Sequence, residues 1–146
     1  MSGNNRHYDA SLTLPILAYC GLIFFLSSLS KLPDSVTLIP DKLGHIALYS
    51  GLGFLTARYW IVGHGVGATR AIGWTVVCCL VYGISDEFHQ YFVPGRESEI
   101  GDVVADVIGG FIGSASCLIA RSSGLPGYVS RWFGTRERDD GPRLGS

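Results

Sequence analysis

Residues 82–110 read YGISDEFHQYFVPGRESEIGDVVADVIGG and contain seven charged side chains and one histidine. This polar stretch lies between two apolar segments, AIGWTVVCCL (residues 71–80) and FIGSASCLIA (residues 111–120). The Pro94-Gly95 pair near its centre is typical of a tight turn. The pattern predicts two apolar helices joined by a short connection, with charged side chains gathered where the helices meet that connection.

The composition of the whole chain points to a lipid bilayer as its main partner. Hydrophobic residues make up 47% and charged residues 16% of the 146 residues, whereas soluble domains carry about 25% charged residues. The net charge of −1 gives no sign of nucleic-acid binding, and no basic stripe with interleaved aromatic residues occurs, so we expect no nucleic-acid partner. The four cysteines lie in apolar segments without metal-ligand spacing, and we expect no cofactor.

Four segments satisfy the length and polarity of membrane-spanning helices. Residues 11–30 carry no charge, and about 20 apolar residues cross a bilayer as a helix. His45 and Arg58 lie near the ends of the second segment, where polar tips can reach the membrane face. The first segment lacks a signal-peptide cleavage pattern, so we expect it to be retained. The predicted fold is an all-α integral membrane bundle over residues 11–121, with helices at about 11–30, 43–62, 71–93 and 102–120.

Short tails, residues 1–10 and 122–146, are predicted to flank this domain. With four spans, the tails and the connection at residues 63–70 share one side of the membrane. That side would carry eight of the eleven Lys and Arg residues and the opposite side three, Lys31, Lys42 and Arg96. The positive-inside rule therefore predicts an inner (plasma) membrane protein with both termini in the cytoplasm. The same four-span topology places the start of the second helix close to the connection between the third and fourth helices.

Helical spacing sorts the polar residues at this outer end into inward and outward groups. Gly109 and Gly113 form a small-residue stripe that predicts close approach of another helix. His89 is expected to point away from the third helix's inward face, and Glu97 and Glu99 to be solvated. The inward group is predicted to be Asp41, His45 and Tyr49 on the second helix, Gly83, Glu87 and Gln90 on the third, and Asp102 and Asp106 on the fourth, with Lys42 beside them and Arg96 above them.

Two other interpretations of these residues remain open. In a purely structural one, Asp41 and Asp102 are helix N-terminal acids, and Lys42 and Arg96 neutralise neighbours such as Glu87 and Asp106. In the other, Asp86-x-x-His89, with i, i+3 spacing and His45 nearby, binds a metal. Carboxylates near histidines are common without a metal, so no metal is predicted.

Two spaced motifs resemble those of the VanZ-like membrane protein family. The first is D-K-x-x-H-x-x-x-Y, formed by Asp41, Lys42, His45 and Tyr49. The second comprises Gly83, Ser85, Glu87, Gln90, Pro94, Arg96, Asp102, Asp106 and Gly109. The resemblance covers about residues 12–120, and Asp106 stands where the family often has Asn. It implies a small multi-span protein of the cell envelope, in a family with some members associated with resistance to glycopeptide antibiotics such as teicoplanin.

Two functional hypotheses follow. In the preferred one, Lys42 and Arg96 hold an anionic lipid or lipid-linked envelope precursor. Asp41, Tyr49, Glu87, Gln90, Asp102 and Asp106 then line the binding site. In the alternative, the protein is a membrane hydrolase or transferase acting on a lipid-linked substrate. Glu87 or His45 would be its general base, and Arg96 would stabilise developing negative charge.

Overall fold

The computed structural model describes residues 10–29, 41–96 and 98–123. The predicted tails and the loop after the first helix therefore lie almost entirely outside the described residues, as does Glu97. The described part contains α1 (Ala10–Ser27), α2 (Asp41–Arg58), α3 (Ala68–Gln90) and α4 (Ile100–Ser122), and α2 continues into a short π-helix, η1 (Tyr59–Gly63). None of the described residues forms a strand, and the all-α prediction is confirmed.

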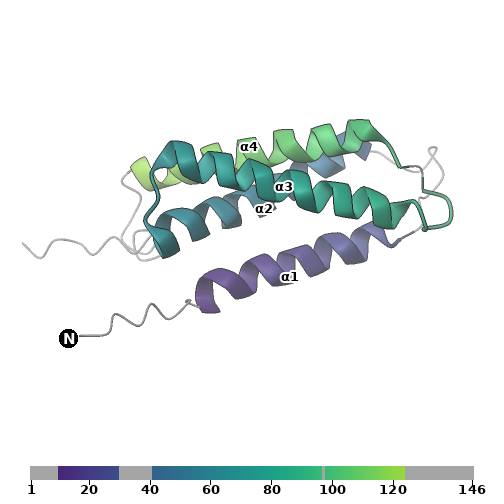
Figure 1. Ribbon diagram of the computed structural model, residues 1–146, viewed down its shortest axis with the longest axis horizontal. Helices are drawn as coiled ribbons and strands as arrows, with labels where there is room; N and C mark the ends of the chain where they lie inside the picture. Colours follow the sequence, from purple (N-terminus) through teal and green to yellow (C-terminus); the bar gives the residue numbers. More distant parts are fainter. Residues whose placement is uncertain (1–9, 30–40, 97, 124–146) are drawn as a thin grey trace, which may run out of the picture.

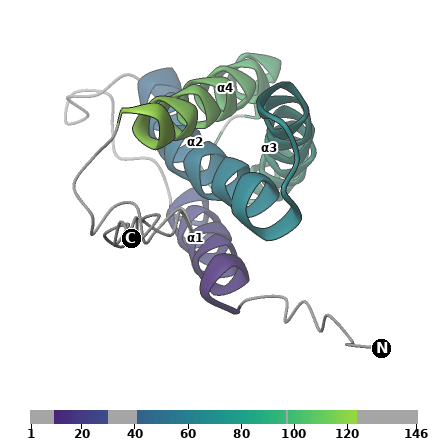
Figure 2. The ribbon, with the colours of Figure 1, turned by 90° about the vertical axis from the view of Figure 1, so that its left-hand side faces the viewer.

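The four helices lie side by side and alternate in direction, so that α1 begins and α4 ends at the same end of the bundle (Figure 1). Seen along the bundle, α2 lies in the middle, with α1, α3 and α4 around it (Figure 2). Large exposed apolar side chains such as Phe25, Val81 and Ile119 belong to the three outer helices, and Leu43 is the one that α2 contributes. The described surface is therefore apolar, as expected for a protein in lipid.

Three of the helices, α1, α3 and α4, are long and apolar enough to cross a membrane. The central helix α2 falls short of that character, because Asp41, Lys42 and Arg58 lie at its ends and glycines and polar residues fill its middle. The prediction of membrane-spanning helices is thus supported for three segments, and a fourth span by α2 remains a prediction.

Glycines allow α2 and α4 to pack backbone against backbone. A Cβ atom added to Gly109 would lie 2.6 Å from the carbonyl oxygen of Ile46, and one added to Gly53 would lie 2.5 Å from that of Gly110. Neither distance leaves room for a side chain, so the close approach predicted from the Gly109-x-x-x-Gly113 stripe is confirmed.

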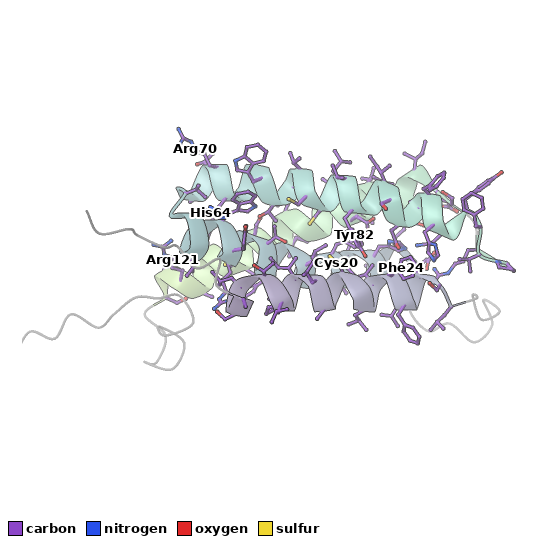
Figure 3. All side chains as sticks on the ribbon, turned by 60° about the horizontal axis from the view of Figure 1, so that its bottom comes forward. Cys20, Phe24, His64, Arg70, Tyr82 and Arg121 are labelled. Carbon is purple, nitrogen blue, oxygen red and sulfur yellow. The ribbon has the colours of Figure 1, made fainter. Side chains whose placement is uncertain are left out.

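The interior changes character along the bundle. Apolar clusters fill the half near η1, around Ala57 and Ile61, and the middle, around Ile23 and Leu52. Arg70 and Arg121 mark the η1 end, whereas Phe24 lies toward the opposite end (Figure 3). That opposite end, where α1 and α3 end and α2 and α4 begin, contains the buried ionisable groups.

Candidate functional site

Four carboxylates are almost completely buried at this end of the bundle. The exposed fractions are 4% for Asp86, 5% for Glu87, 2% for Asp102 and 0% for Asp106. Burying a carboxylate is costly unless it is paired and hydrogen-bonded. The partners of these groups therefore define what the site is built to hold.

Asp106 of α4 is paired with His45 of α2. The Nδ1 atom of His45 lies 2.9 Å from Oδ1 of Asp106. Gly83 of α3 makes room for this carboxylate, since a Cβ there would lie 2.5 Å from Oδ2 of Asp106. Three helices thus fix one carboxylate–imidazole pair, and when Nδ1 donates to Asp106, the other ring nitrogen, Nε2, is left with a free lone pair.

Asp86 links α3 to α1. Its Oδ1 accepts a hydrogen bond from Ser27 Oγ at 2.6 Å, and its Oδ2 accepts one from Gln90 Nε2 at 3.0 Å. Asp86 is not among the residues that helical spacing predicts to face inward. Ser27 was also missed, because the first helix was interpreted only as an apolar span. The serines at the end of that helix were the available signal.

The two cations described at this end, Lys42 and Arg96, bind different partners from those considered in the structural interpretation. Arg96 donates to the carbonyl oxygens of Leu29 (Nε, 3.1 Å) and Leu26 (Nη2, 3.2 Å), and its Nη1 lies 3.8 Å from Asp41 Oδ1. It thereby caps the C-terminal end of α1, where the carbonyl oxygen of Leu26 also accepts a hydrogen bond from the N–H of Leu29 at 3.2 Å. Neither this cation nor Lys42 forms an ion pair with Glu87 or Asp106 among the described contacts.

Lys42 instead lies at the rim. Its Nζ donates to Glu99 Oε2 at 2.8 Å and lies 3.7 Å from Asp102 Oδ1. Glu99 is exposed, as expected of a solvated charge, with 50% of its side chain accessible, and it also pairs with Lys42. The backbone N–H of Glu99 also donates to Glu87 Oε2 at 2.9 Å, so Glu87 joins the end of α3 to the start of α4.

Asp86 and His89 do not converge on one site. While Asp86 contacts Ser27, the Nε2 atom of His89 lies 2.9 Å from Ser28 Oγ, and its ring stacks on Phe24 with centroids 4.3 Å apart. The two side chains therefore bind different residues at the C-terminal end of α1, Asp86 the last residue of the helix and His89 the residue after it. Their joint role as metal ligands finds no support in this geometry.

A polar cavity of about 90 Å³ lies between α1, α2 and α3. Five predicted site residues line it, namely Asp41, His45, Tyr49, Gln90 and Arg96, together with the unpredicted Ser27 and Asp86. Four predicted residues do not line it: Lys42 is at the rim, and Glu87, Asp102 and Asp106 lie among α2, α3 and α4. At roughly 30 Å³ per water molecule, the cavity has room for about three water molecules. One small polar group of a ligand could occupy the same volume.

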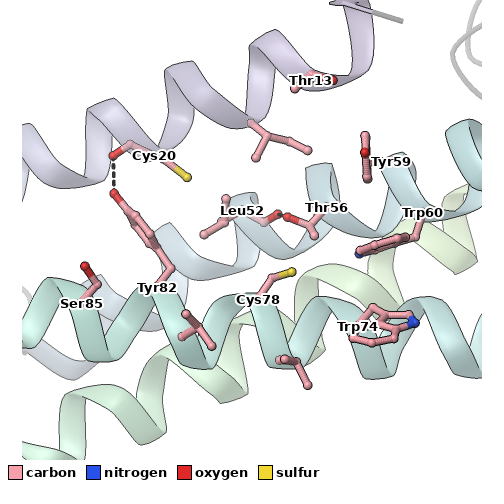
Figure 4. Close-up of a pocket in the computed structure, with 13 residues that line it drawn as sticks. Thr13, Cys20, Leu52, Thr56, Tyr59, Trp60, Trp74, Cys78, Tyr82 and Ser85 are labelled. Atoms are coloured by element: carbon pink, nitrogen blue, oxygen red, sulfur yellow. Dashed lines mark hydrogen bonds between the residues drawn. The ribbon is translucent and has the colours of Figure 1, made fainter. Parts of the chain in front are cut away.

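A larger apolar groove of about 680 Å³ lies between the same three helices (Figure 4). It begins one helical turn from the polar cavity, where Tyr82 OH donates to the carbonyl oxygen of Cys20 at 2.7 Å. Toward the η1 end it is bounded by Trp60 and Trp74, whose rings stack with centroids 5.8 Å apart. A polar cavity and an apolar groove thus follow one another along the bundle.

These features define an all-helical protein with three helices able to cross a membrane and a carboxylate-rich site buried at one end. The model of the VanZ/LLP1 family matches residues 5–121, which include α1, α2, α3 and nearly all of α4. The chain belongs to this family, as its two motifs predict. Comparisons with curated proteins and with solved structures gave no match.

Proposed function

We propose that this protein binds an anionic lipid or a lipid-linked envelope precursor in the cell membrane. The polar cavity would receive part of the headgroup, and the apolar groove would receive a hydrocarbon chain. The observation that carries this proposal is the position of the two spaces, one helical turn apart between α1, α2 and α3. In this proposal a single amphipathic ligand extends from one space into the other.

The charges at the mouth of the cavity support recognition of a headgroup. Arg96 lines the cavity, and guanidinium groups bind phosphate through paired hydrogen bonds. Lys42, 56% of whose side chain is exposed, lies at the rim of the same end. Gln90 and Ser27 add groups suited to the hydroxyl or amide parts of a headgroup.

The groove supports a hydrocarbon chain as the other half of the ligand. Two helices that are long and apolar enough to cross a membrane, α1 and α3, form its sides. Its volume is within the range of about 300–1,000 Å³ that is typical of ligand pockets. Its lining is apolar apart from a few hydroxyl and thiol groups, so it suits an alkyl chain.

The proposal includes α2 as a fourth membrane span. Residues Asp41–Gly63, helix α2 with η1, would be about 34 Å long at 1.5 Å per residue, enough for a hydrocarbon core. Gly51 of α2 packs against Tyr19 of α1, and Gly53 packs against Gly110 of α4, rather than against lipid. Both termini would lie in the cytoplasm, and the site would face outward, where envelope precursors are used. Resistance to glycopeptide antibiotics such as teicoplanin is the physiological role that this placement suggests.

Lipid retention by matched charge variants tests the proposal. The detergent-purified chain is incubated with equal amounts of phosphatidylglycerol and phosphatidylcholine, and bound lipid is quantified by mass spectrometry. Wild type is expected to retain phosphatidylglycerol preferentially, and the double variant Lys42→Gln, Arg96→Gln to lose that preference. The control, Arg70→Gln with Arg121→Gln, removes the same charge at the opposite end and is expected to behave as wild type.

Equal retention of the anionic lipid by wild type and the Lys42, Arg96 variant would refute the proposal. Because Arg96 also binds carbonyls of α1, each variant is first checked for monodispersity and helix content. The charge-preserving variant Arg96→Lys separates loss of the cation from loss of the α1 contacts.

One observation favours the alternative of a hydrolase or transferase. The buried His45–Asp106 pair resembles the carboxylate-oriented imidazole of a general base, and His45 lines the cavity together with Arg96. Glu87, the other expected base, does not line the cavity and is engaged by the backbone of Glu99. Incubating wild type and His45→Gln with native membrane lipids and searching for cleaved or transferred products distinguishes the two functions.

A further inference from the structure

We infer that Asp41, His45 and Asp102 form a binding site for a divalent transition-metal ion such as Mn²⁺ or Zn²⁺. One ligand atom from each of these side chains lies within 4.8 Å of the others. They come from two helices: Asp41 and His45 are one turn apart on α2, and Asp102 is in the first turn of α4. This inference does not depend on lipid binding.

A second observation, independent of this spacing, is the state of Asp102. Its carboxylate is 2% exposed, and its Oδ1 accepts no hydrogen bond from the described residues. Lys42 Nζ lies 3.7 Å away, well beyond the 2.7–2.9 Å of a charge-assisted hydrogen bond, and is engaged by Glu99. A buried carboxylate oxygen without a donor is costly, and a cation bound closer than the lysine would satisfy it.

The outer shell of the site also matches that of a metal centre. Histidines that bind metals usually donate their second ring N–H to a carboxylate, which fixes the tautomer and raises the basicity of the ligating nitrogen. The Nδ1 atom of His45 lies 2.9 Å from Asp106 Oδ1, leaving Nε2 as the ligand. Asp106 is therefore a positioning residue, and Gly83 provides the space that its carboxylate needs.

The charge balance of this end supports a cation as well. Four buried carboxylates lie there among the described residues, namely Asp86, Glu87, Asp102 and Asp106, and they outnumber the two permanent cations described at this end, Lys42 and Arg96. A divalent ion offsets part of this excess. One imidazole and two carboxylates suit Mn²⁺ or Zn²⁺ better than Mg²⁺ or Ca²⁺, which prefer oxygen ligands alone.

Mn²⁺ is the preferred probe, because it binds weakly to the chain's four cysteine thiols. The full-length protein, purified in detergent and stripped of metals, is titrated with Mn²⁺ while the electron paramagnetic resonance signal of the free ion is recorded. Wild type is expected to bind one ion per chain. Asp102→Asn and His45→Gln are expected to abolish that binding. Asp41→Asn is also expected to abolish Mn²⁺ binding. Because Asp41 is partly exposed, this variant keeps the test valid if one of the buried variants fails to fold.

Three further variants separate a metal centre from a general acidic patch. Asp106→Asn is expected to weaken Mn²⁺ binding roughly 10–100-fold, the usual effect of losing an outer-shell partner. Lys42→Gln is expected to strengthen it, because it removes a competing cation from Asp102. Asp86→Asn, at a buried carboxylate already bound by Ser27 and Gln90, is the matched control and is expected to leave it unchanged.

Failure of wild type to bind Mn²⁺ would overturn the inference. So would equal loss of affinity in Asp86→Asn and Asp102→Asn, which indicates diffuse attraction to acidic groups. Displacement of Mn²⁺ by an equal concentration of Mg²⁺ would show that the imidazole is not a ligand, and would equally reject the site. Because no lipid is added, none of these outcomes bears on the lipid proposal.

Discussion

The contact between α2 and α4 allows a sharp prediction about stability. In the variant Gly113→Ala, the new methyl group would overlap the carbonyl oxygen of Ser50 and lie 2.7 Å from the backbone nitrogen of Phe54. Both atoms belong to the backbone of α2, so no side chain can rotate away. Ordinary carbon–oxygen contacts are about 3.3–3.6 Å, and α2 therefore has to move outward by roughly 1 Å or more.

Such a displacement costs packing along the whole α2–α4 interface. A gap of about 0.5–1 Å forfeits a quarter to a half of each dispersion contact, and overpacking of this kind typically costs about 1–3 kcal/mol. Alanine has a higher helix propensity than glycine, which stabilises the folded helix by up to about 1 kcal/mol. Because the added methyl group would clash with backbone atoms, we take the upper end of that cost, about 3 kcal/mol, less about 1 kcal/mol for helix propensity. We therefore expect a net loss of about 2 kcal/mol in the free energy of unfolding.

The assay is unfolding in detergent with increasing sodium dodecyl sulfate, followed by circular dichroism. The control is Gly73→Ala on α3, where an added Cβ meets no atom within 4 Å. It is expected to leave stability unchanged or raise it by up to about 1 kcal/mol. If both variants unfold at the same fraction of sodium dodecyl sulfate, the result would contradict the close backbone approach of α2 and α4 at Gly113.

Three further predictions concern the site and its orientation. Ser27→Ala removes a donor from buried Asp86 and is expected to cost about 1–3 kcal/mol in the same unfolding assay; an unchanged midpoint contradicts the α1–α3 link. Gly83→Ala is expected to destabilise through Asp106, so a double-mutant cycle with Asp106→Ala should show coupling of about 0.5–3 kcal/mol, and additive effects would refute that contact. His64→Cys, in a background without native cysteines, is expected to react with an impermeant maleimide only after cells are permeabilised; labelling in intact cells would reverse the proposed topology.

Much of the fold was predictable because its signals are local. Long uncharged runs predict α1, α3 and α4, and the Gly109-x-x-x-Gly113 spacing predicts the tight packing of α4. The low hydropathy of α2 is the exception. Its polarity follows from its central position, where it contacts three helices instead of lipid, and a sequence window does not record which face meets lipid.

The site was predicted in part, for a similar reason. Helical periodicity correctly placed His45 and Asp106 inward, but it could not identify which carboxylate each cation meets. The pairing of Lys42 with Glu99 depends on the bend between α3 and α4, and the burial of Asp86 depends on Ser27 of α1. These contacts are set by the packing of helices distant in sequence, which spacing within one helix does not contain.

In the proposed function, one amphipathic ligand occupies the polar cavity and the apolar groove together. Native mass spectrometry of the protein purified from membranes tests it most directly, using Arg96→Gln at the cavity, Cys78→Trp in the groove, and Val104→Trp on the exposed face of α4 as the control. We predict one retained lipid per wild-type and control chain, lost in both of the other variants. Retention unaffected by either variant, or no retained lipid on wild type, would contradict the account.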